Sequence, residues 1–153
     1  MNRSNALQDI EAVFAQMAEL WNRHDTRAYT ALWAEDADFV NVIGMHRRGR
    51  KELLAEMDYL HADRFKDTHI RIERRTVKFL TPEFALAHVW WEMNGDPGMP
   101  GIPTVNGRRR GVFTHVLQLT PEGWRFIASQ NTDVLPVPDP IRAGETVPAA
   151  AQA

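Results

Sequence analysis

The chain has 153 residues, a formal net charge of -2, no cysteine, 44% hydrophobic and 25% charged residues. These fractions are ordinary for one globular domain with a buried core. The charge balance argues against a nucleic-acid or anionic-membrane partner, and the missing cysteines exclude disulfides, thiolate nucleophiles and cysteine-ligated metals. No apolar run approaches the roughly 20 residues that span a bilayer, and the N-terminus lacks an apolar signal core, so we expect a cytoplasmic protein.

Helices are predicted in the first part of the chain. Apolar residues recur at three- and four-residue steps in the segment 5–24, which indicates an amphipathic helix that Asn5 caps. Asp25 is a suitable N-cap for a second, shorter helix that carries Leu32 and Trp33. A short alternating strand is expected at residues 38–43. Gly49 then opens a third helix, whose apolar stripe consists of Leu53, Met57, Leu60 and His61.

From residue 68 onward the apolar pattern has period two, which predicts strands. Tight turns separate them into a four-strand antiparallel meander at residues 68–79, 84–94, 112–119 and 124–134. A slip of the apolar phase at residues 74–76 predicts a β-bulge. Helices followed by strands indicate an α+β fold. We expect one domain at residues 1–135 and a disordered tail at 136–153, where proline and alanine replace periodicity.

Both faces of the strand at residues 84–94 are apolar, with Trp90 and Trp91 pointing in opposite directions. A sheet with one wet face is more polar than this. We therefore expect one face to cover the helices and the other to meet a second subunit in a homodimer. The loop at residues 95–107 carries Met99 and Ile102, which suggests a lid or a subunit clasp.

Polar residues interrupt the predicted inward faces of four separate elements: Asn41, His61, His115 and Gln130. A buried polar group without a hydrogen bond costs about 1–3 kcal/mol, so each residue is either a satisfied core group or part of a polar site. If the four converge, they form the polar lining of a ligand pocket.

A pocket of this kind favours a flat or hydrophobic small molecule. Histidine is the natural acid or base near neutral pH, so His61 and His115 are the candidate catalytic residues. The expected ligand-binding residues are Met17, Trp21, Trp33, Phe39, Asn41, Met57, Val89, Trp91, Gln130 and Thr132. We expect neither a metal nor another cofactor, because no His-x-x-x-His spacing and no dinucleotide fingerprint is present.

Four stretches carry a family resemblance: residues 21–25 (WNRHD), 34–41 (AEDADFVN), 49–53 (GRKEL) and 122–127 (EGWRFI). With them, residues 7–134 resemble the nuclear transport factor 2-like superfamily, and within it the SnoaL-like, SgcJ/EcaC-type branch. The resemblance implies a cone-shaped curved antiparallel sheet packed on three N-terminal helices, a cystatin-like α+β barrel. It also implies a dimer formed through the outer face of the sheet and, from the biosynthetic context of this branch, a polyketide-like ligand.

Most catalytic residues known from this superfamily have no equivalent at the matching positions of this sequence. The aspartate base of ketosteroid isomerases falls on Asn41, their tyrosine on Met17 and their second acid on or near His115. The histidine pair of scytalone dehydratase has possible counterparts in His61 and His115. Three functions therefore stay open: a lyase, isomerase or cyclase using histidine acid–base chemistry, a non-catalytic binder or carrier of a hydrophobic molecule, and a dimeric interaction module.

Overall fold

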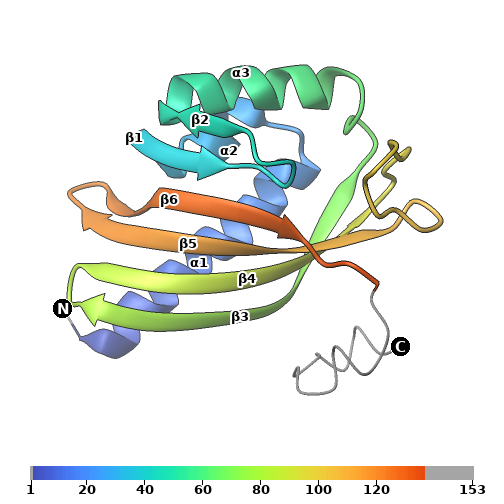
Figure 1. Cartoon of the computed structure of the whole chain (residues 1–153). Coiled ribbons are helices and arrows are strands. Elements are labelled where there is room, and N and C mark those ends of the chain that lie inside the picture. The colour runs from blue at the N-terminus through green and yellow to red at the C-terminus, as the bar shows by residue number, and fades with distance from the viewer. Residues whose placement is uncertain (1, 137–153) are drawn as a thin grey trace.

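The structure is a computed structural model that describes residues 2–136, so all but the first residue of the predicted tail lies outside the described part (Figure 1). The helices are α1 (Arg3–Asn22), α2 (Thr26–Thr30) and α3 (Gly49–Ala62). The strands are β1 (Trp33–Val40), β2 (His46–Arg48), β3 (His69–Thr81), β4 (Phe84–Asn94), β5 (Arg109–Thr120) and β6 (Gly123–Asp133). No helix within residues 2–136 is long and apolar enough to cross a membrane.

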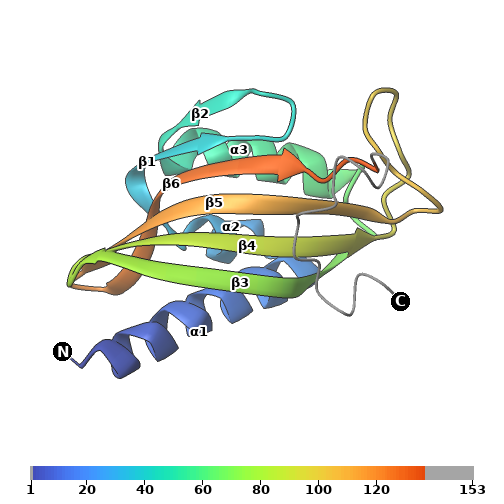
Figure 2. The same cartoon turned by 60° about the horizontal axis from the view of Figure 1, so that its bottom comes forward.

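One sheet contains every strand of the described chain, in the order β2-β1-β6-β5-β4-β3. The α+β class and the meander β3 to β6 are confirmed. The sheet is mixed, however, because β1 pairs with β6 in parallel. The helices lie on one face, with α1 packed against β3 and β6 and α3 packed over β1 (Figures 1 and 2).

Capping explains where the first helices differ from the prediction. The side chain of Asn2 accepts a hydrogen bond from the Ser4 backbone N–H, so Asn2 caps α1 in place of the predicted Asn5, and the helix begins at Arg3. Asp25 caps α2 as predicted. That helix is only one turn long, and Trp33 begins β1 instead of extending the helix.

Besides a shift at the end of β3, between Phe79 and Thr81, two irregularities set the register of the meander. One lies between Ile72 and Arg74 of β3, close to the predicted bulge. The other was not predicted: Val116 pairs with Ala128 and Leu117 pairs with Phe126, so Ile127 is an extra residue in β6. An extra residue exchanges the two faces of the strand beyond it.

The exchange of faces in β6 changes the orientation of two predicted site residues. Beyond the bulge in β6, Ser129 is buried and Asn131 faces the interior, whereas Gln130 and Thr132 are exposed. The prediction that Gln130 and Thr132 point inward was therefore wrong. It assumed unbroken alternation from Trp124 to the end of the strand.

The interior is solid at one end and hollow at the other. Large side chains that are almost wholly inaccessible fill the solid end: Phe14, Met17, Trp33, His115, Leu117, Trp124 and Phe126. Two predicted site residues, Met17 and Trp33, thus belong to the packed core. The hollow end lies between α3 and the last residues of β4, next to the loop at 95–108.

Candidate functional site

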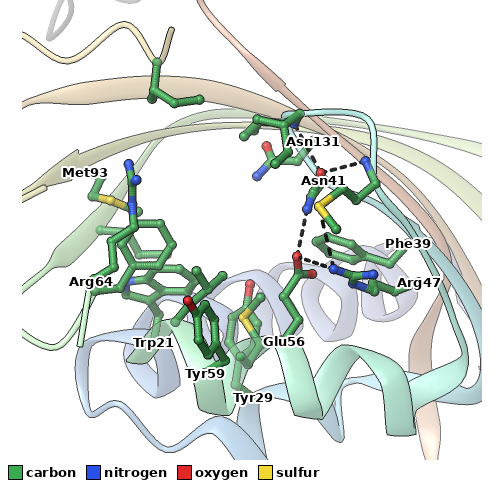
Figure 3. Close-up of a pocket in the computed structure, with 18 of the residues that line it drawn as sticks. Trp21, Tyr29, Phe39, Asn41, Arg47, Glu56, Tyr59, Arg64, Met93 and Asn131 are labelled. Carbon is green, nitrogen blue, oxygen red and sulfur yellow. Dashed lines mark hydrogen bonds and ion pairs between the residues drawn. The ribbon is translucent and has the colours of Figure 1, made fainter. Parts of the chain in front are cut away.

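A cavity of about 780 Å³ occupies the hollow end, and Figure 3 shows its interior. Its volume is within the usual range for small-molecule sites. Helix α3, the turn between β1 and β2, and strands β4, β5 and β6 all contribute to its wall. Aromatic side chains make up much of the lining: Trp21, Tyr29, Phe39, Tyr59, Phe65, Trp91 and Phe113.

Glu56 of α3 is the carboxylate buried in this wall, with its side chain only 9% exposed. Its Oε1 accepts a hydrogen bond from Asn41 Nδ2 at 2.7 Å and pairs with Arg47 Nη2 at 3.4 Å. Its Oε2 has no hydrogen-bond partner within residues 2–136, and neither has the buried Arg47 Nε. One carboxylate oxygen is held in place, and the other is buried without a hydrogen-bond partner in the described chain.

The neighbours of Glu56 fix its orientation. The Asn41 Oδ1 accepts from the backbone N–H groups of Ile43 and Met45 at 3.1 and 2.9 Å. Since the carbonyl oxygen of the amide is used in this way, its NH₂ group faces Glu56. The turn between β1 and β2 thereby positions the carboxylate on α3.

Tyr29 adds a phenol on the same side of the cavity, where Figure 3 shows it beside Glu56. Burial, and secondarily the negative charge of Glu56, raise the pKa of Tyr29 well above its usual value. The phenol therefore stays protonated at neutral pH, and a protonated phenol is a hydrogen-bond donor.

The opposite wall is built around Trp91. Its indole Nε1 donates to Asn131 Oδ1 at 2.9 Å. A Cβ on Gly111 would overlap this indole, so glycine at that position lets the ring lie against β5. Trp21 is fixed in a similar way, because its Nε1 donates to Thr68 Oγ1 at 3.0 Å.

A charge cluster closes the rim near the loop at 95–108. Arg64 contacts Asp96 at 3.2 Å, and Arg109 contacts Asp96 at 3.3 Å and Asp133 at 2.8 Å. Burial raises the pKa of Asp133, although Arg109 opposes the shift. Met99 of the loop lies 2.7 Å from Arg64 through its sulfur. Both rim arginines thus already have carboxylate partners.

His115, one predicted catalytic residue, is not in the cavity wall. Its ring is fully buried between Phe113 and Phe126, at centroid distances of 4.6 and 4.0 Å. Its Nδ1 lies 2.7 Å from Ser129 Oγ, which accepts from Trp33 Nε1 at 2.9 Å. Burial, with a smaller effect of His88, lowers the pKa of His115 to about 3, so the ring is neutral at neutral pH.

His61, the other predicted catalytic residue, also lies outside the wall. It packs against Trp21, which does line the cavity, at a centroid distance of 4.3 Å. Its Nδ1 is 2.9 Å from the Nδ1 of His24. Burial and then His24 lower the pKa of His61 to about 4, with Asp58 opposing them. The two predicted histidines therefore do not meet in one site.

The other predicted site residues lie at different depths in the interior. The wall includes Trp21, Phe39, Asn41, Met57 and Trp91. Val89 is inward-facing but fully buried beneath the cavity. Val89 and Trp91 share one face of β4 and lie about 7 Å apart along the strand. This distance is enough to place Val89 in the solid end of the interior and Trp91 in the hollow end. Alternation predicts the face of a strand but not the depth of each residue.

Sequence reasoning missed Glu56, Tyr29, Arg47 and Asn131. A signal for Glu56 existed: it lies three residues after Leu53 and four before Leu60, within the apolar stripe of α3. Asn131 was missed because the bulge in β6 reverses its face. Within residues 2–136, no group of three or more histidine, aspartate or glutamate side chains is arranged to hold a metal.

A family model described as SnoaL-like domain matches residues 14–125. The chain therefore belongs to the SnoaL-like domain family. No curated protein matches it.

Solved structures agree on the fold. A protein of unknown function with a cystatin-like fold from Nostoc punctiforme is 26% identical, with a TM-score of 0.76, and the match covers 99% of this chain and 92% of that one. An uncharacterized cystatin-like protein from Caulobacter vibrioides is 24% identical, with a TM-score of 0.78 and coverage of 92% and 96%. A protein from Streptomyces avermitilis, described as a "putative dehydratase" of the NTF2-like family, is 19% identical, with a TM-score of 0.72 and coverage of 88% and 99%.

Proposed function

We propose that the chain is a cofactor-independent enzyme of the lyase or isomerase type, which binds a hydrophobic, ring-containing molecule and moves one of its protons with Glu56. The Glu56 carboxylate carries this proposal: Asn41 and Arg47 hold one oxygen, and the other has no partner within the described chain. A positioned carboxylate in an apolar cavity is suited to general acid–base catalysis.

The surrounding wall supports a ring-shaped substrate. Trp21 and Trp91 are held by their own indole hydrogen bonds, so they offer fixed aromatic surfaces. A polyketide-like ring system, which the family resemblance implies, would match such surfaces. Neither His61 nor His115 is placed for the acid–base role, because neither lines the cavity.

The proton step uses only groups of this chain. A C–H bond beside a substrate carbonyl breaks, its proton goes to Glu56 Oε2, and its electron pair moves to the carbonyl oxygen, which becomes an enolate. Arg47 and the protonated Tyr29 are hydrogen-bond donors beside the carboxylate. Glu56 then returns the proton to another carbon, which completes an isomerisation, or to a departing hydroxyl, which leaves as water while a double bond forms.

Proton exchange into a simple ring ketone tests the proposal. Wild-type protein is expected to accelerate replacement of the α-protons of 2-tetralone by deuterium in D₂O, followed by proton NMR. Glu56→Gln is expected to reduce this rate by about 100-fold, since a general base contributes on that order. Glu122→Gln, in the exposed turn before β6, is the matched control and should exchange like wild type.

Exchange at the uncatalysed rate with wild type, or at the wild-type rate with Glu56→Gln, would contradict the enzyme proposal. A non-catalytic carrier is the second candidate, because most of the wall is apolar or aromatic. A carrier would bind 2-tetralone without exchanging its protons.

A further inference from the structure

Two unpartnered polar atoms of opposite kind belong to one cluster in the cavity wall. Glu56 Oε2 is an acceptor, Arg47 Nε is a donor, and both are buried without a hydrogen-bond partner in the part of the chain that the structure describes. The two side chains touch through Glu56 Oε1 and Arg47 Nη2 at 3.4 Å. Buried polar atoms of this kind are ordinarily satisfied, so the pair points to a ligand group that supplies both missing bonds.

We infer that the ligand presents a hydroxyl on a ring system to this pair, as a phenol, an alcohol or the enol form of a ring ketone. A hydroxyl donates its proton to Glu56 Oε2 and accepts from Arg47 Nε through a lone pair. This inference rests on the proposed function, because it names the substrate class of the same cavity. The enol is the O-protonated form of the enolate that proton transfer to Glu56 produces, so an enol ligand resembles the reacting state.

Other head groups leave one of the two atoms unsatisfied. An ether or an unenolised ketone offers no proton to Glu56 Oε2. A carboxylate adds a second negative charge beside Glu56, which is unfavourable in a buried site. The cations at the rim do not offset that charge, because Arg64 and Arg109 are already paired with Asp96.

Three naphthalenes of similar size separate these cases by isothermal titration calorimetry: 2-naphthol, 2-methoxynaphthalene and 2-naphthoate. Wild type is expected to bind 2-naphthol at least about tenfold more tightly than 2-methoxynaphthalene, since a site built for a hydroxyl discriminates against an analogue that cannot donate. The anion 2-naphthoate should bind most weakly. Glu56→Met, which removes the acceptor at similar size, should bind 2-naphthol and 2-methoxynaphthalene equally, while Glu122→Gln keeps the preference.

Arg47→Met is a second variant, at a side chain that is 26% exposed, and should lose part of the preference for the hydroxyl. Thermal unfolding of each variant shows that it is folded before titration. Equal binding of 2-naphthol and 2-methoxynaphthalene by wild type, or an unchanged preference in a folded Glu56→Met protein, would overturn the hydroxyl inference and leave the cavity proposal standing. Failure of all three compounds to bind wild type would instead contradict the proposed function itself.

Discussion

Replacing His115 by leucine should remove a large part of the acid sensitivity of this protein. His115 is fully buried, and burial lowers its pKa to about 3, whereas the same residue in the unfolded chain titrates near 6.5. Between these two values the unfolded state binds a proton that the folded state does not. Stability contributed by the neutral ring is therefore complete above about pH 6.5 and is lost as the pH falls toward the folded-state pKa.

The size of the effect follows from this difference in proton binding. Between pH 7 and pH 5 the unfolded histidine changes from mostly neutral to almost fully protonated, while the folded residue stays neutral. Linkage then lowers the free energy of unfolding by about 2 kcal/mol over this interval. This value does not depend on the folded-state pKa as long as that pKa is well below 5.

Urea denaturation of wild type and His115→Leu at pH 7 and pH 5 measures this difference. At pH 7 we expect the variant to be within about 1–2 kcal/mol of wild type, because losing the Ser129 hydrogen bond and ring stacking is offset by removing the unpartnered Nε2. The free energy of unfolding of the variant, relative to that of wild type, should be about 2 kcal/mol higher at pH 5 than at pH 7. His69→Leu, at an exposed position, is the control. An equal decrease in the free energy of unfolding of wild type and His115→Leu between pH 7 and pH 5 would refute the reasoning.

Three further predictions concern other parts of the molecule. His61→Leu should lower the free energy of unfolding by about 1 kcal/mol, because His24 loses its partner, and should leave the rate of 2-tetralone exchange unchanged. Loss of this exchange in the variant would show that His61 takes part in the reaction. Gly111→Ala should destabilise the fold by about 1–3 kcal/mol and weaken 2-naphthol binding, because the new Cβ displaces the Trp91 indole; wild-type binding would contradict this role of the glycine. Sedimentation should show a homodimer that Trp90→Glu weakens, through the sheet face opposite the helices; a monomeric wild type at micromolar concentration would exclude the dimer.

Local patterns predicted the framework of the fold well. The third helix begins at Gly49 as predicted, and the strands β3 to β6 follow the period-two segments closely. These features depend on neighbours in the sequence, so they are visible in it. The parallel pairing of β1 with β6 is a contact between distant segments, and no local pattern specifies it.

The candidate site was harder to predict for two physical reasons. The extra residue at Ile127 reverses the faces of the end of β6, which brings Asn131 inward and turns Gln130 outward. Inward residues also differ in depth, which places His115 in the packed end of the interior and Trp91 at the cavity. Glu56 was missed although the sequence contains a signal for it, namely a charged residue within the apolar stripe of α3.

A crystal structure of the protein with 2-naphthol tests the central claim most directly, namely that this cavity holds a ring-containing ligand against Glu56. We expect the naphthalene to lie in the cavity between the aromatic walls, with its hydroxyl oxygen within hydrogen-bond distance of Glu56 Oε2. Electron density for the ligand elsewhere on the protein, with the cavity empty, would contradict the claim. So would a ligand in the cavity whose hydroxyl points away from Glu56 toward the rim at Asp96.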